Sequence, residues 1–537
     1  MPSIAAAARR RIHPARLSAL PLVTAGATSP GLPRNGTAFR AARQRQRFRY
    51  EESANLRRPF KKRDAPLLDF PAETRLSQRD SVSLLPHLNP MNQFNLGMIG
   101  GGTVGSGVYR ALTQNADLMA ARTGVRVTIG KVAVKAFDEP RPYPIAESVM
   151  TLNWRDVVED PSIHIVTELV GGTGIAKTMI LAALERGKPV VTANKALLSV
   201  HGPELFAAAK RHNTNLYFEA SVAGGIPIIK VLRESLVGNR FERIDGIVNG
   251  TCNYILTRMK REGAAFADVL ADAQRLGYAE ADPTLDVDGH DAAHKIGILA
   301  SLAHGFWVDH HDIHVEGIRP ITPLDIRFAA QLGYTIKLLG MVRTTAAGVA
   351  ARGKKSKAPA GRPISVSVSP TLIPDSHVLA SVNDVFNAVF VSGDPIGDTL
   401  YYGRGAGKDA TASAVLSDIA DAALDLRHAT PQRVPGFVAH NLAGGVLPYS
   451  ATSSRFYLRL NVLDRPGVIA KISAILSKTG ISISSIVQPE GHEGESVPLI
   501  LMTHLAKRAA MDQAVAAIGK LPAVKGPSLL LPVEDFA

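Results

Sequence analysis

The segment AQRLGYAEADPTLDVDGHDAAHK, from Ala273 to Lys295, gathers several carboxylates ahead of one lysine. A helix is expected from Gly289 onward, which places Asp291 and Lys295 four residues apart on one face. A partly buried lysine can donate or accept a proton, and carboxylates can bind an ammonium group. The pattern indicates acid–base chemistry on a small substrate with an amino group, although an exposed ion pair has the same spacing. The acidic residues are Glu280, Asp282, Asp286, Asp288 and Asp291.

A glycine-rich turn, GGGTVG at Gly100–Gly105, follows the first expected strand and precedes a helix. In this setting G-x-G-x-x-G lets the backbone approach a pyrophosphate, while the helix N-terminus supplies N–H donors and partial positive charge. Glycines also join strands to helices for packing alone. The position of the turn favours binding of a nicotinamide dinucleotide by Gly100, Gly102, Thr103, Val104 and Gly105.

Lys135 bears on which dinucleotide is bound. It ends the next expected strand, in VAVKAF, where an acidic residue would otherwise bind a free ribose 2′-hydroxyl. A lysine there suits a 2′-phosphate, so NADP(H) is favoured, with NAD(H) as the alternative. A solvated strand end is the other interpretation of this lysine.

A second glycine cluster, GRGAGK at Gly403–Lys408, lacks the spacing of a phosphate-binding P-loop. It precedes a helical stretch, ATASAVLSDIADAAL. We expect a close backbone approach to the cofactor there, against the alternative of simple helix capping.

The elements around these motifs predict an α/β protein. Strands and amphipathic helices alternate after Asn95, which favours a parallel, doubly wound Rossmann-type sheet. An α+β part and a compact C-terminal strand–helix–strand module follow. The expected divisions are a disordered basic extension at 1–90, a nucleotide-binding domain at 91–225, a substrate domain at 226–400, a return segment to the first domain at 401–445, and a C-terminal domain at 454–537.

Charge is concentrated at the front of the chain. Residues 1–90 hold 17 lysines and arginines against 6 acidic residues, so they carry most of the net charge of +14. The rest is nearly neutral and offers no basic cluster beyond GKKSK at 353–357, in an expected insertion at 346–361, so no nucleic-acid partner is expected. No apolar run suits a membrane helix. The front segment is either an Arg-rich leader or, as we favour, a stretch preceding a true start at Met91.

The single cysteine, Cys252, allows no internal disulfide and fits a reducing compartment, so we expect a cytoplasmic protein. Histidines at 310, 311 and 314 lack the spacing of a metal site and are assigned to a loop. His290 and His294 are expected to flank the active helix without catalysing.

The pattern from Ala273 to Lys295 resembles the signature of homoserine dehydrogenases. The resemblance continues almost unbroken from Asn95 to the end of the chain, and the C-terminal module resembles an ACT domain, which has a ferredoxin-like fold. The other matching motifs are GGGTVGSG, TELVGGT, VVTANKALL, FEASVAGGIPII, GIVNGTCNYILTRM and GRGAGKDATASAV.

The resemblance implies an enzyme that interconverts L-homoserine and L-aspartate 4-semialdehyde with NAD(P), a step towards threonine, methionine and isoleucine. It implies that Lys295 exchanges the proton of the substrate oxygen, helped by Asp291, while Lys195 of TANK lies between nicotinamide and substrate. Glu280, Asp286 and Asp291 would bind the substrate. Gly277 and Gly405 would contact the cofactor.

The resemblance also implies a monovalent-cation site for sodium in the turn EASVAGGI. Its ligands would be largely backbone oxygens, and the ion would be structural. The residues concerned are Glu219, Val222, Gly224 and Ile226.

The ACT-like module implies regulation, with L-threonine as the expected effector bound near Asp464–Val468. A homodimer or homotetramer is expected, with part of the substrate domain forming the interface. A purely dimerising role for the module stays open.

Two rival functions differ in what they require. A semialdehyde dehydrogenase forms a thioester and would need the thiol of Cys252, which has no chemical role in the homoserine reaction. An amino-acid sensor with a vestigial nucleotide fold would not need Lys295, Asp291 and Lys195 intact, and all three are present.

Overall fold

The computed structural model describes residues 92–344, 363–489, 492 and 495–536. The expectations for residues 1–90, for Met91 and for the insertion at 346–361 fall outside these ranges. Within them, no helix is both long enough and apolar enough to cross a membrane.

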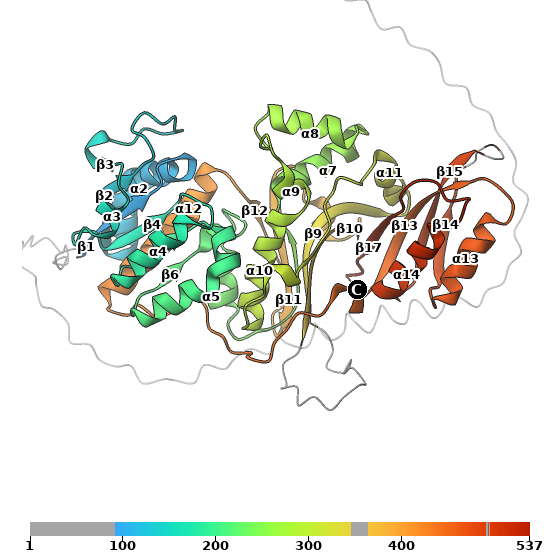
Figure 1. Cartoon of the computed structure of the whole chain (residues 1–537). Coiled ribbons are helices and arrows are strands. Elements are labelled where there is room, and N and C mark those ends of the chain that lie inside the picture. The colour runs from blue at the N-terminus through green and yellow to red at the C-terminus, as the bar shows by residue number, and fades with distance from the viewer. Residues whose placement is uncertain (1–91, 345–362, 490–491, 493–494, 537) are drawn as a thin grey trace, which may run out of the picture. The chain divides into compact units, whose positions relative to one another are not determined.

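The first sheet has six parallel strands in the order β3-β2-β1-β4-β5-β6 (Figure 1). Parallel neighbours need crossover connections, and helices supply most of them. This strand order is that of the dinucleotide-binding Rossmann fold, which confirms the predicted fold class. The elements are β1 (Asn92–Ile99), α2 (Thr103–Thr123), β2 (Val125–Ala133), β3 (Met150–Thr151), α3 (Arg155–Val158), β4 (Ile165–Glu168), α4 (Ile175–Glu185), β5 (Val190–Thr192), α5 (Lys195–Arg211) and β6 (Leu216–Tyr217).

Helix α12 (Lys408–Arg427) returns late in the sequence to pack against α2. Its buried Val415 and Ile419 share an apolar core with Val108 and Leu112 of α2. Strand β12 (Gly397–Arg404), just before α12, belongs to the other sheet. The chain therefore crosses between the two sheets at the glycine cluster that follows Arg404.

The second sheet contains the strands β12-β11-β7-β9-β10 at one side, paired antiparallel. Helix α10 packs closely on it, since a Cβ added to Gly340 of β9 would meet the side chain of Ile296 at 3.0 Å. The elements of this part are α6 (Ile228–Lys230), β7 (Arg240–Ile247), α7 (Gly250–Glu262), α8 (Phe266–Arg275), α9 (Thr284–Val287), α10 (His290–His304), β8 (His314–Val315), α11 (Pro323–Gln331), β9 (Tyr334–Thr344), β10 (Ile364–Pro374) and β11 (Phe386–Asp394).

The C-terminal module continues the same sheet. Its last strand, β17, pairs antiparallel with β13 and also parallel with β10, where Leu372 faces Val533. The order β17-β13-β15-β14, with a helix after β13 and another before β17, is the ferredoxin-like arrangement predicted for an ACT domain. The module is thus hydrogen-bonded to the substrate-binding part. Its elements are β13 (Ser453–Leu463), α13 (Val468–Lys478), β14 (Ile483–Val487), β15 (Ser496–Thr503), β16 (Ala506–Lys507), α14 (Arg508–Ile518) and β17 (Leu529–Val533).

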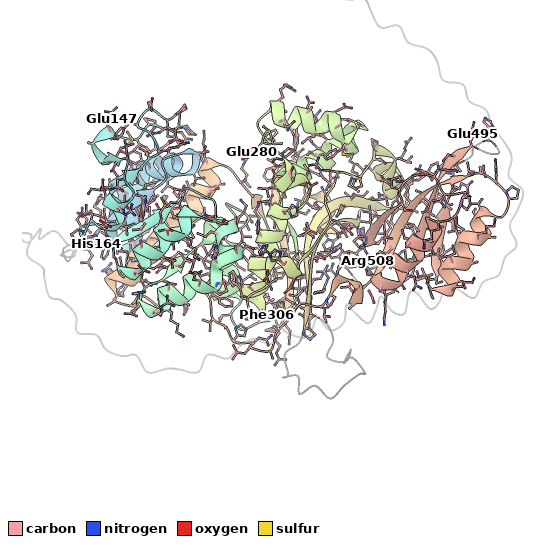
Figure 2. All side chains as sticks on the ribbon, in the orientation of Figure 1. Glu147, His164, Glu280, Phe306, Glu495 and Arg508 are labelled. Atoms are coloured by element: carbon pink, nitrogen blue, oxygen red, sulfur yellow. The ribbon has the colours of Figure 1, made fainter. Side chains whose placement is uncertain are left out.

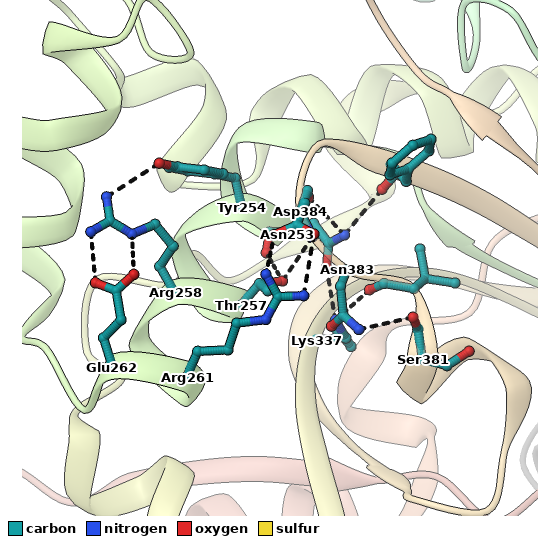
Figure 3. A network of polar contacts seen from close by, with 12 residues as sticks. Asn253, Tyr254, Thr257, Arg258, Arg261, Glu262, Lys337, Ser381, Asn383 and Asp384 are labelled. Carbon is teal, nitrogen blue, oxygen red and sulfur yellow. Dashed lines mark hydrogen bonds and ion pairs between the residues drawn. The ribbon is translucent and has the colours of Figure 1, made fainter. Parts of the chain in front are cut away.

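A buried lysine ties α7 to the second sheet (Figure 3). Lys337 of β9 is 1% exposed, and its ammonium donates to Asn253 Oδ1 at 3.0 Å, to Asn383 Oδ1 at 3.2 Å and to the carbonyl of Val382. Asn253 in turn donates to the carbonyl of Asp384 at 3.0 Å. Burial lowers the pKa of Lys337 to about 7. The start of α7, which adjoins the site described next, is thereby held to the sheet.

Replacing Lys337 by methionine is expected to destabilise the protein by about 1–3 kcal/mol, because Asn253 and Asn383 lose a buried donor. The unfolded chain keeps the lysine proton up to the ordinary pKa of 10.5, whereas the folded chain releases it near 7. The contribution of Lys337 to the stability of the wild type should therefore rise from pH 7 to pH 9, by at most about 1.4 kcal/mol per pH unit. Urea unfolding at both pH values measures this, and K337M should lack the rise. An equal rise in both proteins would contradict the assignment.

Candidate active site

Lys295 and Asp291 form a buried ion pair on α10. Lys295 Nζ lies 2.8 Å from Asp291 Oδ2. Lys295 is 8% exposed and Asp291 is 9% exposed. The lysine also donates to the carbonyl of Val248, at 2.7 Å. Helix α10 begins after Gly289, whose φ of +89° suits glycine and places Asp291 in the first turn. The predicted i, i+4 pair is therefore buried and oriented, in contrast to a solvated surface pair.

Lys195 adds a second positive charge beside Asp291, and it comes from helix α5 of the nucleotide-binding part. Its Nζ lies 3.3 Å from Asp291 Oδ1. It is the first residue of α5, and Asn194 caps that helix by accepting from the backbone N–H of Leu197 at 3.1 Å. Asn194 also donates to the carbonyl of Gly172, at 2.8 Å. The TANK turn thus presents a half-exposed lysine to the carboxylate on α10.

Asn249 is a site residue that the sequence analysis missed. Its amide donates to Asp286 Oδ1 at 2.7 Å and to Asp291 Oδ2 at 2.9 Å, so one buried NH₂ group links two carboxylates. Its Oδ1 accepts from the backbone N–H of Cys252, at 2.8 Å, and caps α7. The signal in the sequence was an asparagine at a strand-to-helix turn, a favoured N-cap.

Two lysines control the charge of Asp291. Burial raises its pKa, but the positive charges of Lys295 and Lys195, with hydrogen bonds from Lys295 and Asn249, outweigh burial and hold the pKa at about 2. Asp291 is consequently an anion at any pH at which the protein works. A fixed negative charge between two ammonium groups is suited to proton transfer at one of them.

The loop between α8 and α9 carries the remaining acidic candidate. Glu280 is exposed there, and its carbonyl accepts from Gln274 Nε2 at 3.0 Å (Figure 2). Gly277 precedes it with a φ of +76° and open space where a Cβ would stand. Asp286 is linked to Asp291 through the amide of Asn249, which donates to both carboxylates. No such link to Glu280 is present among the described residues.

The first glycine turn borders a cavity of about 380 Å³. Gly100 adopts a φ of +107°, and a Cβ on Gly105 would lie 1.9 Å from the carbonyl oxygen of Gly100, so both positions require glycine. A Cβ on Gly102 would meet nothing within 4 Å, and Gly102 lines this cavity directly before α2, which starts with Thr103 and Val104. Exposed Lys135, two residues after the end of β2, lines the same cavity.

The loop predicted to hold a cation packs against the second glycine cluster. A Cβ on Gly224 would meet the carbonyl of Gly405 at 2.6 Å, and Gly225 N donates to the Arg404 carbonyl at 3.0 Å. The Glu219 carboxylate accepts from the backbone N–H groups of Ile229 and Lys230, at 2.9 and 2.8 Å.

Some backbone carbonyl oxygens of the same loop accept no hydrogen bond from a described residue. Among the described residues, none donates a hydrogen bond to the carbonyls of Val222 and Gly224. The Ile226 carbonyl accepts one, from Ile228 N at 2.8 Å. Two backbone carbonyls of this loop are therefore without a described hydrogen-bond donor.

Cys252 is fully buried at the start of α7 and donates from Sγ to the carbonyl of Asp286 at 3.1 Å. Burial and the surrounding carboxylates raise the pKa of this thiol well above its usual value. The thiolate is the reactive form of cysteine. The thioester chemistry of the rival semialdehyde dehydrogenase therefore has no suitable nucleophile here.

Comparison with known proteins agrees with this geometry. Residues 227–420 match the family model "Homoserine dehydrogenase", residues 100–219 match "Homoserine dehydrogenase, NAD binding domain", and residues 456–523 match "ACT domain". Homoserine dehydrogenase of Pseudomonas aeruginosa is 44% identical over 453 residues, covering 83% of this chain and all of the relative. That of Neisseria gonorrhoeae is 41% identical over 449 residues, with 83% and 100% covered.

Solved structures show the same likeness. A homoserine dehydrogenase from Thiobacillus denitrificans has 43% identity and a TM-score of 0.76, covering 83% of this chain and 99% of its own. A hyperthermophilic archaeal homoserine dehydrogenase in complex with NADPH has 27% identity and a TM-score of 0.50, covering 62% and 98%. With the Rossmann sheet, the buried lysine–aspartate pair and these matches together, the chain belongs to the homoserine dehydrogenase family.

Proposed function

We propose that Lys295 exchanges the proton of the substrate hydroxyl during the oxidation of L-homoserine to L-aspartate 4-semialdehyde. Its contact with Asp291 at 2.8 Å carries this assignment, because a buried ammonium beside a permanent anion is held in one position. In the oxidation direction the hydroxyl gives its proton to the neutral amine of Lys295 as a hydride leaves the same carbon, and in the reverse direction the Lys295 ammonium returns that proton. A nicotinamide held by the first glycine turn would supply the hydride acceptor.

Asp291 has a double role in this proposal, holding Lys295 and binding substrate. Lys195, 3.3 Å from the other oxygen of Asp291, stands on the side of the nucleotide-binding sheet and would lie between cofactor and substrate. Asp286 and Glu280 would bind the ammonium of homoserine. The role of Asp286 has more structural support than that of Glu280, because Asn249 holds Asp286 beside Asp291 whereas Glu280 lies on an exposed loop.

For the cofactor we propose NADP(H), with NAD(H) as the second candidate. Lys135 shares a cavity with Gly100 and Gly102, where it can meet a 2′-phosphate while the turn approaches the pyrophosphate. The archaeal relative was solved with NADPH, which supports a nicotinamide cofactor in this family. Gly277 and Gly405 are proposed as further cofactor contacts.

For the loop at Glu219 we propose a structural sodium ion held by backbone oxygens. The carbonyls of Val222 and Gly224 supply the hard oxygen ligands that such an ion prefers, with Glu219 and Ile226 completing the set. Its position against Gly405 would stiffen the cofactor side of the site.

For regulation and assembly, our proposals rest on the ACT module. The ACT module supports an amino-acid effector, for which L-threonine is our proposal, and a homodimer or homotetramer. Cys252, buried as a free thiol, is consistent with a reducing cytoplasm. The divisions at 91–225, 226–400, 401–445 and 454–537 remain our proposed domain boundaries.

K295M is expected to lower kcat for homoserine about 10²–10⁴-fold, because it removes the acid–base group and leaves Asp291 in place. The KM for NADP should change little. Steady-state kinetics at alkaline pH measure both, with exposed Lys478 changed to methionine as the matched control. A K295M enzyme with near wild-type kcat would refute the role of this lysine.

N249S is expected to reduce kcat/KM for homoserine about 10–100-fold, because one donor to two carboxylates is lost. Serine can still cap α7, so the fold should persist. Because Asp291 stays an anion throughout the working pH range, the pH–rate profile should keep its shape, and the loss should appear as a raised KM for homoserine. Lowered stability with an unchanged kcat/KM for homoserine would mean that Asn249 is only a helix cap.

K135E is expected to raise the KM for NADP at least about tenfold and to leave that for NAD unchanged or lower, since a carboxylate repels a 2′-phosphate. Initial rates with both cofactors, each with and without threonine, measure the preference and test the effector together. Equal KM values for NADP in wild type and variant would contradict a phosphate contact at this lysine.

A further inference from the structure

A cluster of imidazoles lies beside the catalytic helix, outside the proposed active site. His294 is on α10, directly before Lys295, and His290 precedes it by one turn on the same face. A short 3₁₀ turn after α10 contains His310 and His311, and Asp309 caps its start. The sequence alone indicates a loop for these histidines and does not single out Asp309.

The donor atoms of this turn are close together. One ligand atom each of Asp309, His310 and His311 lies within 4.8 Å of the other two. Asp309 Oδ1 is 3.3 Å from His310 Nδ1 and also accepts from the backbone N–H of His311 at 2.9 Å, so the carboxylate is held against both histidines. The turn thus offers two imidazoles and one carboxylate to a single point.

His294 adds a third imidazole from a different element. Its ring centre is 6.0 Å from that of His310, and the centres of His310 and His311 are 3.9 Å apart. With Zn–N bonds of about 2.1 Å and tetrahedral angles, two imidazoles on one zinc ion have centres about 5 Å apart. The observed separations lie on either side of this value. His294 is not among the residues whose donor atoms lie within 4.8 Å of one another, so its side chain would have to rotate towards the turn to join them.

A buried nitrogen of His294 without a hydrogen-bond partner is a separate indication of a bound ligand. Nδ1 of His294 is buried and has no hydrogen-bond partner among the described residues. A buried polar atom without a partner is costly unless something binds it. Helix α10 therefore carries a buried imidazole nitrogen without a described partner, on a residue whose ring lies beside that of His310.

We propose that His294, His310, His311 and Asp309 bind one first-row transition metal ion of the zinc class. Three neutral imidazoles and a carboxylate suit zinc or cobalt and differ from the all-oxygen set proposed for sodium. The site would clamp the turn at 309–311 to α10. It would also place a divalent charge near Asp291 and Lys195, so metal occupancy would act on the electrostatics of the active site.

The test uses the full chain without a polyhistidine tag, stripped of metal and titrated with Co²⁺. We expect one equivalent to give the strong visible absorption of a four-coordinate cobalt site, and Zn²⁺ to remove it. In H310Q/H311Q the Co²⁺ affinity should fall about tenfold or more, at least the cost of disturbing a ligand's outer shell. The same loss is expected for H294Q.

The matched control is H428Q, at an exposed histidine after α12, which should bind Co²⁺ as the wild type does. Circular dichroism on each variant verifies folding, and His310 and His311 lie in a surface turn that tolerates substitution. Absence of the absorption at one equivalent would overturn the site. So would equal Co²⁺ affinity in the wild type and in folded H310Q/H311Q. Both outcomes are independent of homoserine turnover, so they leave the proposed catalytic roles untouched.

Discussion

The site depends on one buried anion, the carboxylate of Asp291. An isolated charge at such a position would be strongly unfavourable, and here each oxygen has a positive or hydrogen-bonding partner: Lys295 and Asn249 on one, Lys195 on the other. These partners come from α10, from the turn before α7 and from the start of α5. Satisfying a single carboxylate thus brings the nucleotide-binding part and the substrate-binding part to the same point.

The surrounding backbone serves this arrangement. Asn194 and Asn249 cap the helices whose first turns carry Lys195 and Cys252, and each also makes a second contact across the site. The absence of a side chain at Gly224 lets this loop lie against the backbone of Gly405 in the second cluster. Close backbone contact there joins the chain's crossing point between sheets to the loop proposed to hold sodium.

The ACT module is coupled to the catalytic sheet by more than a linker. Asp325, fully buried at the start of α11, accepts from Arg459 Nε at 2.6 Å and from the hydroxyl of Tyr457 at 3.0 Å, both on β13. Arg508 of α14 lies 2.9 Å from Glu316, in the segment where Ile318 N donates to the carbonyl of Val287. These contacts connect the module to Val287, the residue after Asp286, so the effector proposed for the module would have a short physical route to the proposed substrate site.

The sequence by itself determined the fold class and most of the chemistry. A glycine turn between strand and helix, alternating strands and helices, and an i, i+4 aspartate–lysine pair depend on local spacing, which the sequence shows directly. The tertiary structure decided what local spacing does not encode. Asn249, Lys195 and Asp291 are far apart in the chain and meet only through sheet packing, and the pairing of β17 with β10 depends on a contact between distant strands. Burial decided the rest, because it distinguishes the paired, water-excluded Lys295 from a surface ion pair of identical spacing.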